Sequence, residues 1–266
     1  MNQPLAYVHP QAKIADNTVI EPFTIIHKNV EIDEGTWIGS NVTIMPGARI
    51  GKNCKIFPGA VISAIPQDLK FAGEETLVRI GNNNTIREFA TINRGTRANN
   101  ETVIGDNNLI MAYVHIAHDC IIGNHCILAN SVALAGHIEI DDYAIVGGMS
   151  AVHQFVKIGK HSMVSGGCLV RKDVPPYVKA AREPLAFAGV NSIGLRRRGF
   201  SDQVINQIQE IYRTLYLRQN NVSQAVRIIE TELPATDERD EILDFIASSA
   251  RGIMKGYSRI SPNNNY

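Results

Sequence analysis

The stretch IGDNNLIMAYVHIAHDCIIGNHCIL, residues 104–128, carries an aliphatic residue at every sixth position. The same step of six begins at Val8, reaches Ile62 without a gap, and returns in phase from Ile80 to Val170. Of the 28 positions in this register, 25 are Ile, Leu or Val. A period of six fits neither a helix nor a long alternating strand, but it fits short strands between turns, each burying one aliphatic side chain. Three such hexads complete one triangular coil, so the register predicts about nine coils of a parallel β-helix.

The residues that follow the aliphatic positions are of the types that tight corners favour. Runs such as IGKN at 50–53, IGNN at 80–83 and IGDN at 104–107 combine Gly, Asn and Asp. These residue types tolerate positive φ, so we expect them to form the corners of the coil.

Two interruptions of the register predict loops. Asp68, Glu74 and Ala98 stand where the pattern requires a branched aliphatic residue. Because polar side chains are not buried without a partner, we expect loops that project from the coil at residues 64–77 and 95–103.

The hexads stop at residues 174–176, where two prolines occur. Beyond Ser201, a residue type favoured at helix N-caps, apolar residues recur with helical spacing. We expect three helices at one end of the solenoid, at residues 204–215, 222–233 and 237–251. The predicted architecture is an all-β solenoid over residues 1–185, followed by an α-helical domain over residues 186–266.

The chain has 266 residues with 26 basic and 26 acidic side chains, so its formal net charge is zero. These charges are unevenly distributed, because residues 151–200 hold nine basic and two acidic side chains. Within this basic segment Arg196, Arg197 and Arg198 follow one another, and arginine suits bidentate contact with phosphate. A phosphorylated ligand or an acidic partner protein is the functional alternative to a merely solvated edge of the solenoid.

Several classes of protein are disfavoured by the composition. The chain has one Trp and no aromatic pattern of RNA-binding domains, and no apolar stretch reaches the roughly 18 residues of a membrane span. The start, MNQPLAYVHP, does not resemble a secretory signal peptide. We therefore expect a cytoplasmic protein that neither binds nucleic acid nor inserts into a membrane. Reduced, buried thiols rather than disulfides or a zinc site are expected at Cys54, Cys120, Cys126 and Cys168, which form no CxxC pair.

The coil of 18 residues places chemically active residues above one another. His118, Gly136 and Gln154 are 18 positions apart and form one vertical column, with His137 and His153 one residue to either side of it. A histidine beside a glycine with accessible backbone N–H groups is the minimal arrangement of a general base next to an oxyanion site.

Two other interpretations of these histidines stay open. A single histidine on a solenoid surface is more often solvated or at an interface than catalytic. Alternatively, His115, His118 and His137 are the three imidazole ligands of a catalytic zinc ion. His115 precedes His118 by three residues and faces a different side of the coil, so the three do not converge well within one chain, although a neighbouring subunit could supply one.

Five motifs spread over the chain resemble those of one family. They are HIAHDC at 115–120, PQDLKFAGE at 66–74, AVHQF at 151–155, DVPPYV at 173–178 and GLRRRGF at 194–200. Together with the hexads and the helical C-terminal part, they resemble the UDP-N-acetylglucosamine O-acyltransferases, which begin lipid A biosynthesis. The resemblance spans essentially the whole chain, whereas hexads alone are shared by many acyltransferases and by γ-type carbonic anhydrases.

The resemblance implies a fold and a reaction. The fold is a homotrimer of left-handed β-helices with active sites between neighbouring chains, an exception to the usual right-handed crossover. The reaction transfers an R-3-hydroxyacyl chain from acyl carrier protein to the 3-hydroxyl of UDP-N-acetylglucosamine, without a metal or dissociable cofactor. Because acyl carrier protein is acidic, the basic segment is expected to contact it.

The resemblance also implies roles for residues at matching positions. His118 is expected to be the general base, Asp119 to orient its imidazole, and Gly136 to donate its backbone N–H to the oxyanion. Gly166 matches the position of an acyl-chain ruler, and a glycine there implies a long 3-hydroxyacyl chain. The expected substrate-binding residues, of which the last three hold the nucleotide, are Gln67, Asp68, Lys70, His115, His137, His153, Gln154, Asn191, Arg197 and Arg198.

Two departures from the family pattern leave the acceptor open. Asn93 stands where relatives carry His, and Ile193 stands where some carry an acid, so a 3-amino analogue of the sugar stays an alternative acceptor. The sibling N-acyltransferase of the same pathway has an extra domain ahead of the hexads, which begin here at Val8. The alternatives from other functional classes are a zinc-dependent hexapeptide hydratase and a non-catalytic trimeric scaffold.

Overall fold

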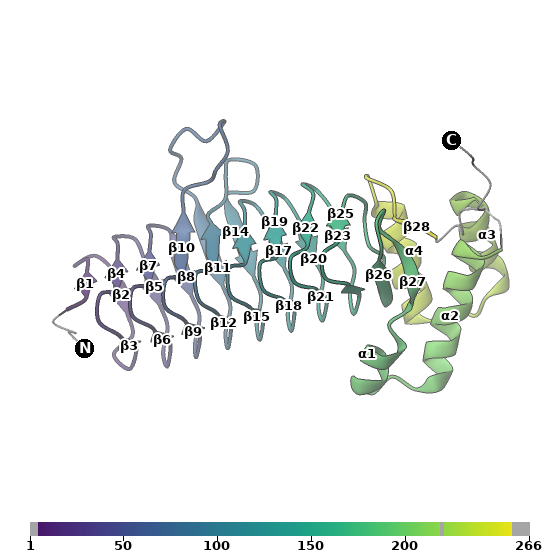
Figure 1. The fold of residues 1–266 in the computed structure, drawn as a ribbon, viewed down its shortest axis with the longest axis horizontal. Helices are drawn as coiled ribbons and strands as arrows, with labels where there is room; N and C mark the ends of the chain where they lie inside the picture. The colour runs from purple at the N-terminus through teal and green to yellow at the C-terminus, as the bar shows by residue number, and fades with distance from the viewer. Residues whose placement is uncertain (1–4, 219–220, 257–266) are drawn as a thin grey trace.

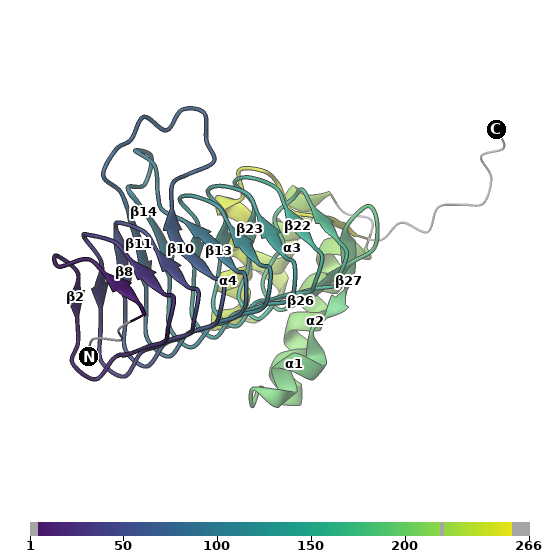
Figure 2. The same ribbon diagram turned by 60° about the vertical axis from the view of Figure 1, so that its left-hand side comes forward.

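The computed structural model describes residues 5–218 and 221–256 of the chain. Most of the chain forms a solenoid whose three parallel sheets are the faces of a long triangular prism (Figure 1, Figure 2). The predicted left-handed parallel β-helix with a helical C-terminal region is therefore confirmed.

Each coil contributes one short strand to each face of the prism. The first sheet contains β1 (Tyr7–Val8), β4 (Ile25–Ile26), β7 (Thr43–Ile44), β10 (Val61–Ala64), β13 (Thr91–Asn93), β16 (His115–Ile116), β19 (Ala133–Leu134), β22 (Ala151–Val152) and β25 (Leu169–Val170). The second sheet contains β2 (Lys13–Ile14), β5 (Glu31–Ile32), β8 (Ala48–Ile50), β11 (Leu77–Ile80), β14 (Glu101–Ile104), β17 (Ile121–Ile122), β20 (Glu139–Ile140) and β23 (Lys157–Ile158). The third sheet contains β3 (Val19–Ile20), β6 (Trp37–Ile38), β9 (Lys55–Ile56), β12 (Thr85–Ile86), β15 (Leu109–Ile110), β18 (Ile127–Leu128), β21 (Ile145–Val146), β24 (Met163–Val164), β26 (Val178–Ala181), β27 (Ala186–Val190) and β28 (Lys255–Gly256).

The register between coils follows the hexad arithmetic. Paired residues such as Ile127 and Ile145 are 18 positions apart. The step grows to 30 positions between Val61 and Thr91 and to 24 positions between Thr91 and His115, because loops are inserted there. Both longer steps exceed 18 by a multiple of six. The insertions therefore leave the phase of the buried aliphatic residues unchanged.

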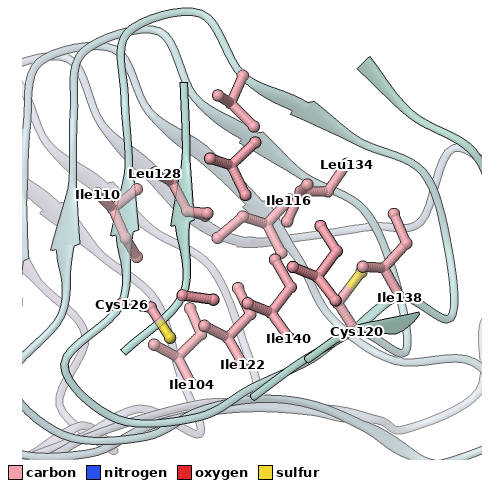
Figure 3. Close-up of a cluster of buried hydrophobic side chains, with 14 of the residues drawn as sticks. Ile104, Ile110, Ile116, Cys120, Ile122, Cys126, Leu128, Leu134, Ile138 and Ile140 are labelled. Carbon is pink, nitrogen blue, oxygen red and sulfur yellow. The ribbon is translucent and has the colours of Figure 1, made fainter. Parts of the chain in front are cut away.

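The buried aliphatic residue of each hexad points into the prism. Ile104, Ile122 and Ile140 lie in one row of the core, and each is at most 2% exposed (Figure 3). Burial of one such side chain contributes about 1.5–3 kcal/mol before conformational entropy is subtracted. All four cysteines are free and buried, as predicted, and Cys120 and Cys126 lie among the core side chains.

The third residue after a buried aliphatic residue forms the corner of the coil. Asn53, Asn83 and Asn107 occupy this position with φ from 55° to 59°, which confirms the expectation for asparagine. The expectation is wrong for the glycine directly after the aliphatic, which is absent from the positive-φ residues of the described chain. A Cβ on Gly105 would lie 2.7 Å from the carbonyl oxygen of Gly123, so the close approach of adjacent coils is what excludes a side chain there.

The two predicted loops project from one edge of the prism (Figure 1). They connect β10 to β11 and β13 to β14, so both lie at the first edge, defined as the edge between the first and second sheets. They span residues 65–76 and 94–100 and are shorter than predicted. Residues 101–103 belong instead to β14, where they pair with β11.

The C-terminal part covers the end of the solenoid with strands and helices (Figure 1). Strand β26 extends the third sheet, β27 returns antiparallel beside it, and β28 pairs with β27. As predicted, Ser201 caps a helix, because its side chain accepts a hydrogen bond from the N–H of Val204. The helices are α1 (Ser192–Arg197), α2 (Asp202–Tyr216), α3 (Val222–Glu232) and α4 (Asp237–Ser248).

Three features of this part differ from the prediction. Helix α1 was not expected, because six residues are too few to show a helical period. Helix α4 ends at Ser248 rather than at residue 251, and the chain then continues into β28. The division at residue 185 stays a prediction, and residues 257–266 of the expected helical domain lie outside the described residues. Over the described ranges, no helix has the length and apolar character needed to cross a membrane.

Candidate active site

The column predicted by the register lies at the first edge. His118, Gly136 and Gln154 follow β16, β19 and β22, which pair with one another in steps of 18 residues. A Cβ on Gly136 would lie 2.5 Å from Cε1 of His118, so the imidazole rests on this glycine. Gly136 is buried, and among the described residues no backbone acceptor receives its N–H.

His118 and Asp119 form a hydrogen-bonded pair. Nδ1 of His118 lies 2.7 Å from Oδ2 of Asp119, whose side chain is fully buried. Burial raises the pKa of the Asp119 carboxyl, but hydrogen bonds from Thr96 and His118 outweigh it and hold the pKa below its ordinary value. An ionised carboxylate only accepts hydrogen bonds, so Nδ1 carries the proton and Nε2 of His118 is the basic nitrogen.

The loop at 65–76 brings one predicted substrate-binding residue close to this pair. Oδ2 of Asp68 lies 4.0 Å from Nε2 of His118. The other Asp68 oxygen accepts a hydrogen bond from the backbone N–H of Lys70 at 2.9 Å, which gives the loop a local turn. The side chains of Gln67 and Lys70 are exposed on the same loop.

His137 lies on the other side of the Asp119 carboxylate. Its Nε2 is 3.6 Å from Oδ2 of Asp119, and its ring meets that of His118 edge-on at 5.2 Å. Burial lowers the pKa of His137, as does the neighbouring His118, while Asp119 and Asp68 act in the opposite direction. Phe155 stacks on the His137 ring at 4.7 Å. Phe155 is not among the predicted site residues, although it follows His137 by 18 positions.

The remaining predicted histidines are less closely associated with the pair. His115 is half-buried on β16, where its Nδ1 lies 2.7 Å from the hydroxyl oxygen of Thr91, and burial lowers its pKa. His153 is exposed and Gln154 is half-buried.

The zinc interpretation with three histidines does not match the observed cluster. The donor atoms that lie within 4.8 Å of one another belong to His118, Asp119 and His137, and His115 is not among them. Both carboxylate oxygens of Asp119 already accept hydrogen bonds from protein groups. The arrangement fits a hydrogen-bonded acid–base pair better than a set of free ligand atoms.

The predicted nucleotide-binding residues lie at the second edge, between the second and third sheets. Asn191 is 4% exposed and donates its amide to the carbonyl oxygen of His161 at 3.0 Å. Arg198 donates to the carbonyl oxygen of Tyr143 at 3.0 Å, and burial lowers the pKa of its guanidinium. Arg197 is exposed at the end of α1. Within one chain, these residues and the His118 pair therefore lie at different edges.

Gly166 lies at the third edge, which is the edge between the third and first sheets, after β24 and before β25. A Cβ there would lie 3.0 Å from the carbonyl oxygen of Gly148 in the preceding coil. A larger residue at this position would have to project from the edge of the prism.

Two contacts to Asp119 were not foreseen. Thr96 and Asn99, from the loop at 94–100, donate hydrogen bonds to its carboxylate. The only signal in the sequence is a polar insertion of one hexad directly before the coil of His118, and this pattern does not identify a partner.

Comparison with known proteins shows which family this chain resembles. The family profile described as UDP N-acetylglucosamine O-acyltransferase, domain 2, matches residues 173–254, and the bacterial transferase hexapeptide profile matches residues 29–64 and 101–136. The acyl-[acyl-carrier-protein]–UDP-N-acetylglucosamine O-acyltransferase of Thiobacillus denitrificans is 45% identical over 253 residues, which cover 95% of this chain and 98% of the relative.

Two crystal structures share the fold along nearly the whole chain. The UDP-N-acetylglucosamine acyltransferase from Bacteroides fragilis is 52% identical with a TM-score of 0.95, covering 96% of this chain and 100% of that one. The enzyme of the same name from Francisella novicida is 44% identical with a TM-score of 0.93, covering 99% and 95%. With such identity over almost its entire length, the chain belongs to the UDP-N-acetylglucosamine O-acyltransferase family.

Proposed function

We propose that this protein transfers an R-3-hydroxyacyl group from acyl carrier protein to the 3-hydroxyl of UDP-N-acetylglucosamine, the first step of lipid A biosynthesis. The observation that carries the proposal is the pair of His118 and Asp119 seated on Gly136 in a member of this family. The proposal is supported by an imidazole that is hydrogen-bonded to a buried carboxylate and lies against Gly136 at one edge of the prism.

The proposed reaction uses these groups in order. Nε2 of His118 takes the proton of the sugar hydroxyl while the hydroxyl oxygen attacks the thioester carbonyl carbon. The carbonyl oxygen becomes an oxyanion, which the N–H of Gly136 stabilises. When the carbon–sulfur bond breaks, the imidazolium of His118 returns the proton to the carrier thiolate. Asp119 keeps the imidazole in the required tautomer and stabilises its charged form.

The substrate would be held by groups around this pair. Gln67, Asp68 and Lys70 on the projecting loop are proposed to contact the sugar nucleotide. His115, His137, His153 and Gln154 are proposed to line the same site from the coil. The exposed cations of the basic segment, such as Arg171 and Lys172, are proposed to meet the acidic carrier protein.

A homotrimer would bring the two halves of the site together. Asn191, Arg197 and Arg198 lie at the second edge, whereas His118 lies at the first edge. A neighbouring chain could place its second edge beside the first edge of this one. We therefore propose that the active site lies between chains, with the nucleotide held by the neighbouring Asn191 and arginines.

The remaining proposals follow from the same reaction. Gly166 offers no side chain to limit the length of an acyl group, so a long 3-hydroxyacyl chain is the proposed donor. The thioester already supplies an activated acyl group, so no metal or dissociable cofactor is proposed. The proposed compartment is the cytoplasm.

The test is an acyl-transfer assay with UDP-N-acetylglucosamine and 3-hydroxyacyl carrier proteins of several chain lengths, for the wild type and His118→Ala. Removal of a general base should lower the rate by about 10²- to 10⁴-fold. If the wild type acylates only the 3-amino analogue, then that analogue rather than UDP-N-acetylglucosamine is the acceptor. A fully active His118→Ala variant would remove His118 as the base. A wild type that is inactive at every chain length and holds stoichiometric zinc would favour the hydratase alternative.

A further inference from the structure

The carboxylate of Asp119 is held by a loop that has no part in the proposed mechanism. Thr96 donates its backbone N–H to Oδ1 at 2.9 Å and its hydroxyl to Oδ2 at 2.6 Å. Asn99 adds an N–H to Oδ1 at 3.3 Å and donates its side-chain amide to the backbone carbonyl of Asp119 at 3.3 Å. Thr96 is only 8% exposed, so its two bonds to the carboxylate are buried, whereas Asn99 is exposed.

The backbone N–H of Asp119 is bound by the coil rather than by this loop, although Asn99 of the loop also reaches the backbone carbonyl. Asp119 occupies a corner with φ of 59°, and its N–H donates to the hydroxyl oxygen of Thr102 at 2.9 Å. The orientation of the carboxylate relative to this backbone depends on the groups that bind its two oxygens. Thr96 is the residue that binds both of them.

One oxygen of Asp119 serves two donors. Oδ2 accepts the Thr96 hydroxyl at 2.6 Å and lies 2.7 Å from Nδ1 of His118. Hydrogen bonds to an ionised group are shorter and stronger than those between neutral groups. The Thr96 hydroxyl therefore sets the position of Oδ2 and takes up part of its negative charge, and both effects reach the imidazole through the bond to Nδ1.

We propose that Thr96 is a positioning residue, which holds the Asp119 carboxylate so that Nε2 of His118 faces the acceptor hydroxyl. It acts through Asp119 and does not touch the substrate. This inference rests on the proposed role of His118 as the base.

Two further charged or titratable groups face the pair and stay unchanged when Thr96 is replaced. They are His137, whose Nε2 is 3.6 Å from Oδ2 of Asp119, and Asp68, whose Oδ2 is 4.0 Å from Nε2 of His118. A change in the pH dependence of a Thr96 variant therefore reports the loss of the hydroxyl.

The test compares the wild type, Thr96→Val and Thr96→Ser over a range of pH. Valine keeps the shape of threonine but removes the donor to Oδ2, so kcat should fall by about 10- to 100-fold with little change in KM. Without the hydroxyl, Oδ2 attracts the imidazolium proton more strongly, so the acid limb of the kcat/KM profile should move to higher pH. Serine restores the donor and should recover most of the rate and the original profile.

A control separates positioning from general destabilisation. Thr24 is also buried, but it lies in an early coil and donates its hydroxyl to a backbone carbonyl, that of Gly39 at 2.9 Å. Thr24→Val should lose stability while keeping kcat and the pH profile. A Thr96→Val variant that loses rate with an unmoved acid limb, or that serine does not rescue, would overturn the proposal.

NMR of histidine-labelled protein tests the proposal without measuring turnover and without a folded Thr96→Val variant. The Nδ1–H proton of His118 should resonate downfield and exchange slowly in the wild type and in Thr96→Ser. Rapid exchange in the wild type would overturn the proposal. If His118→Ala stays fully active while this proton is protected, then Thr96 holds the pair but the proposed function of His118 fails.

Discussion

Gly136 shows at the scale of one residue how the coil determines the position of the base. Its Cα lies beneath the imidazole of His118, and a Cβ there would lie 2.5 Å from Cε1 and 2.7 Å from Nε2. Real Cβ atoms do not approach ring atoms so closely, because the repulsion is too strong. The absence of a side chain at this position therefore lets the base approach the backbone N–H that is proposed to bind the oxyanion.

We expect Gly136→Ala to fold and to lose most of its activity. The added methyl group displaces the imidazole, and a shift of about 1 Å in a catalytic group can lower the rate by about 10²-fold. Steady-state kinetics and thermal unfolding of the same preparations measure the two effects. Gly148→Ala is a matched control, since its Cβ would lie 3.0 Å from the carbonyl oxygen of Asn130 at another edge. Equal loss in both variants would contradict the explanation.

At the scale of structural elements, the corners of the second edge form a ladder of stacked rings. Tyr143 stacks on His125 at 4.7 Å and on His161 at 4.8 Å, and His161 stacks on Tyr177 at 5.7 Å. Phe200, beyond α1, covers His161 edge-on at 5.1 Å. This ladder joins the last coils to the helical part, and its central histidine is only 5% exposed.

The ladder should make stability depend on pH. Burial lowers the pKa of His161 from 6.5 to about 4, with further lowering by Arg198 and Lys160 and a small opposing effect of Asp142. Between these pH values the unfolded chain binds a proton that the folded chain does not. The free energy of unfolding should therefore fall as pH decreases, with about 3 kcal/mol lost from this residue by pH 4.

Replacement by phenylalanine tests this expectation. His161→Phe should keep the stack, because Phe155 already occupies a corner with φ of 66°. Its unfolding free energy should depend less on pH than that of the wild type from pH 6.5 to 4, as measured by urea unfolding at fixed protein concentration. His125→Phe, at an exposed position of the same ladder, should keep the wild-type slope. An unchanged slope in His161→Phe would show that other groups cause the pH dependence.

At the scale of the whole molecule, the hexad period constrains which insertions the solenoid accepts. The loop at 94–100 lengthens the coil so that Ile80 pairs with Ile104, 24 positions away, whereas later coils step by 18. One extra hexad keeps every later aliphatic residue facing the core. An insertion that shifts the register by one residue would place the neighbours of the aliphatic residues in the core. The aliphatic side chains of the following strands would then face solvent.

Deletion of residues 96–101 should therefore leave the fold intact and remove activity. Ile104 would then follow Ile92 by six positions, and Gly95 would occupy the corner that requires positive φ. The variant lacks Thr96 and Asn99, so the Asp119 carboxylate keeps His118 but loses the hydrogen bonds from the loop. Circular dichroism and thermal unfolding measure the fold, and the acyl-transfer assay measures the loss.

The control deletion removes residues 96–100 and breaks the phase by one residue. It should unfold at a lower temperature than the six-residue deletion, although it removes less of the chain. If the five-residue deletion were the more stable one, the hexad phase would not be what limits these insertions.

The sequence by itself determined the solenoid and the column of His118, Gly136 and Gln154. The hexad has the same pattern of buried residues and corners in every coil. Residues 118 and 136 therefore lie above one another, because the register between them is unbroken. It also determined the N-cap at Ser201, because capping involves residues only three apart. Its errors in the bounds of elements were at the places without a period, such as helix α1 and the ends of the loops. Within the hexads it was wrong about the conformation of the glycine that follows the aliphatic residue.

Only the tertiary structure decided which groups surround the pair. Thr96 meets Asp119 across 23 positions and Arg198 meets Tyr143 across 55, through segments with no periodic pattern. A loop contact depends on how the inserted chain returns to the coil, and an arginine contact depends on where a short helix packs. Both contacts depend on packing and hydrogen bonding over the whole fold. The coil depends only on the buried aliphatic residue and the corner that each hexad repeats.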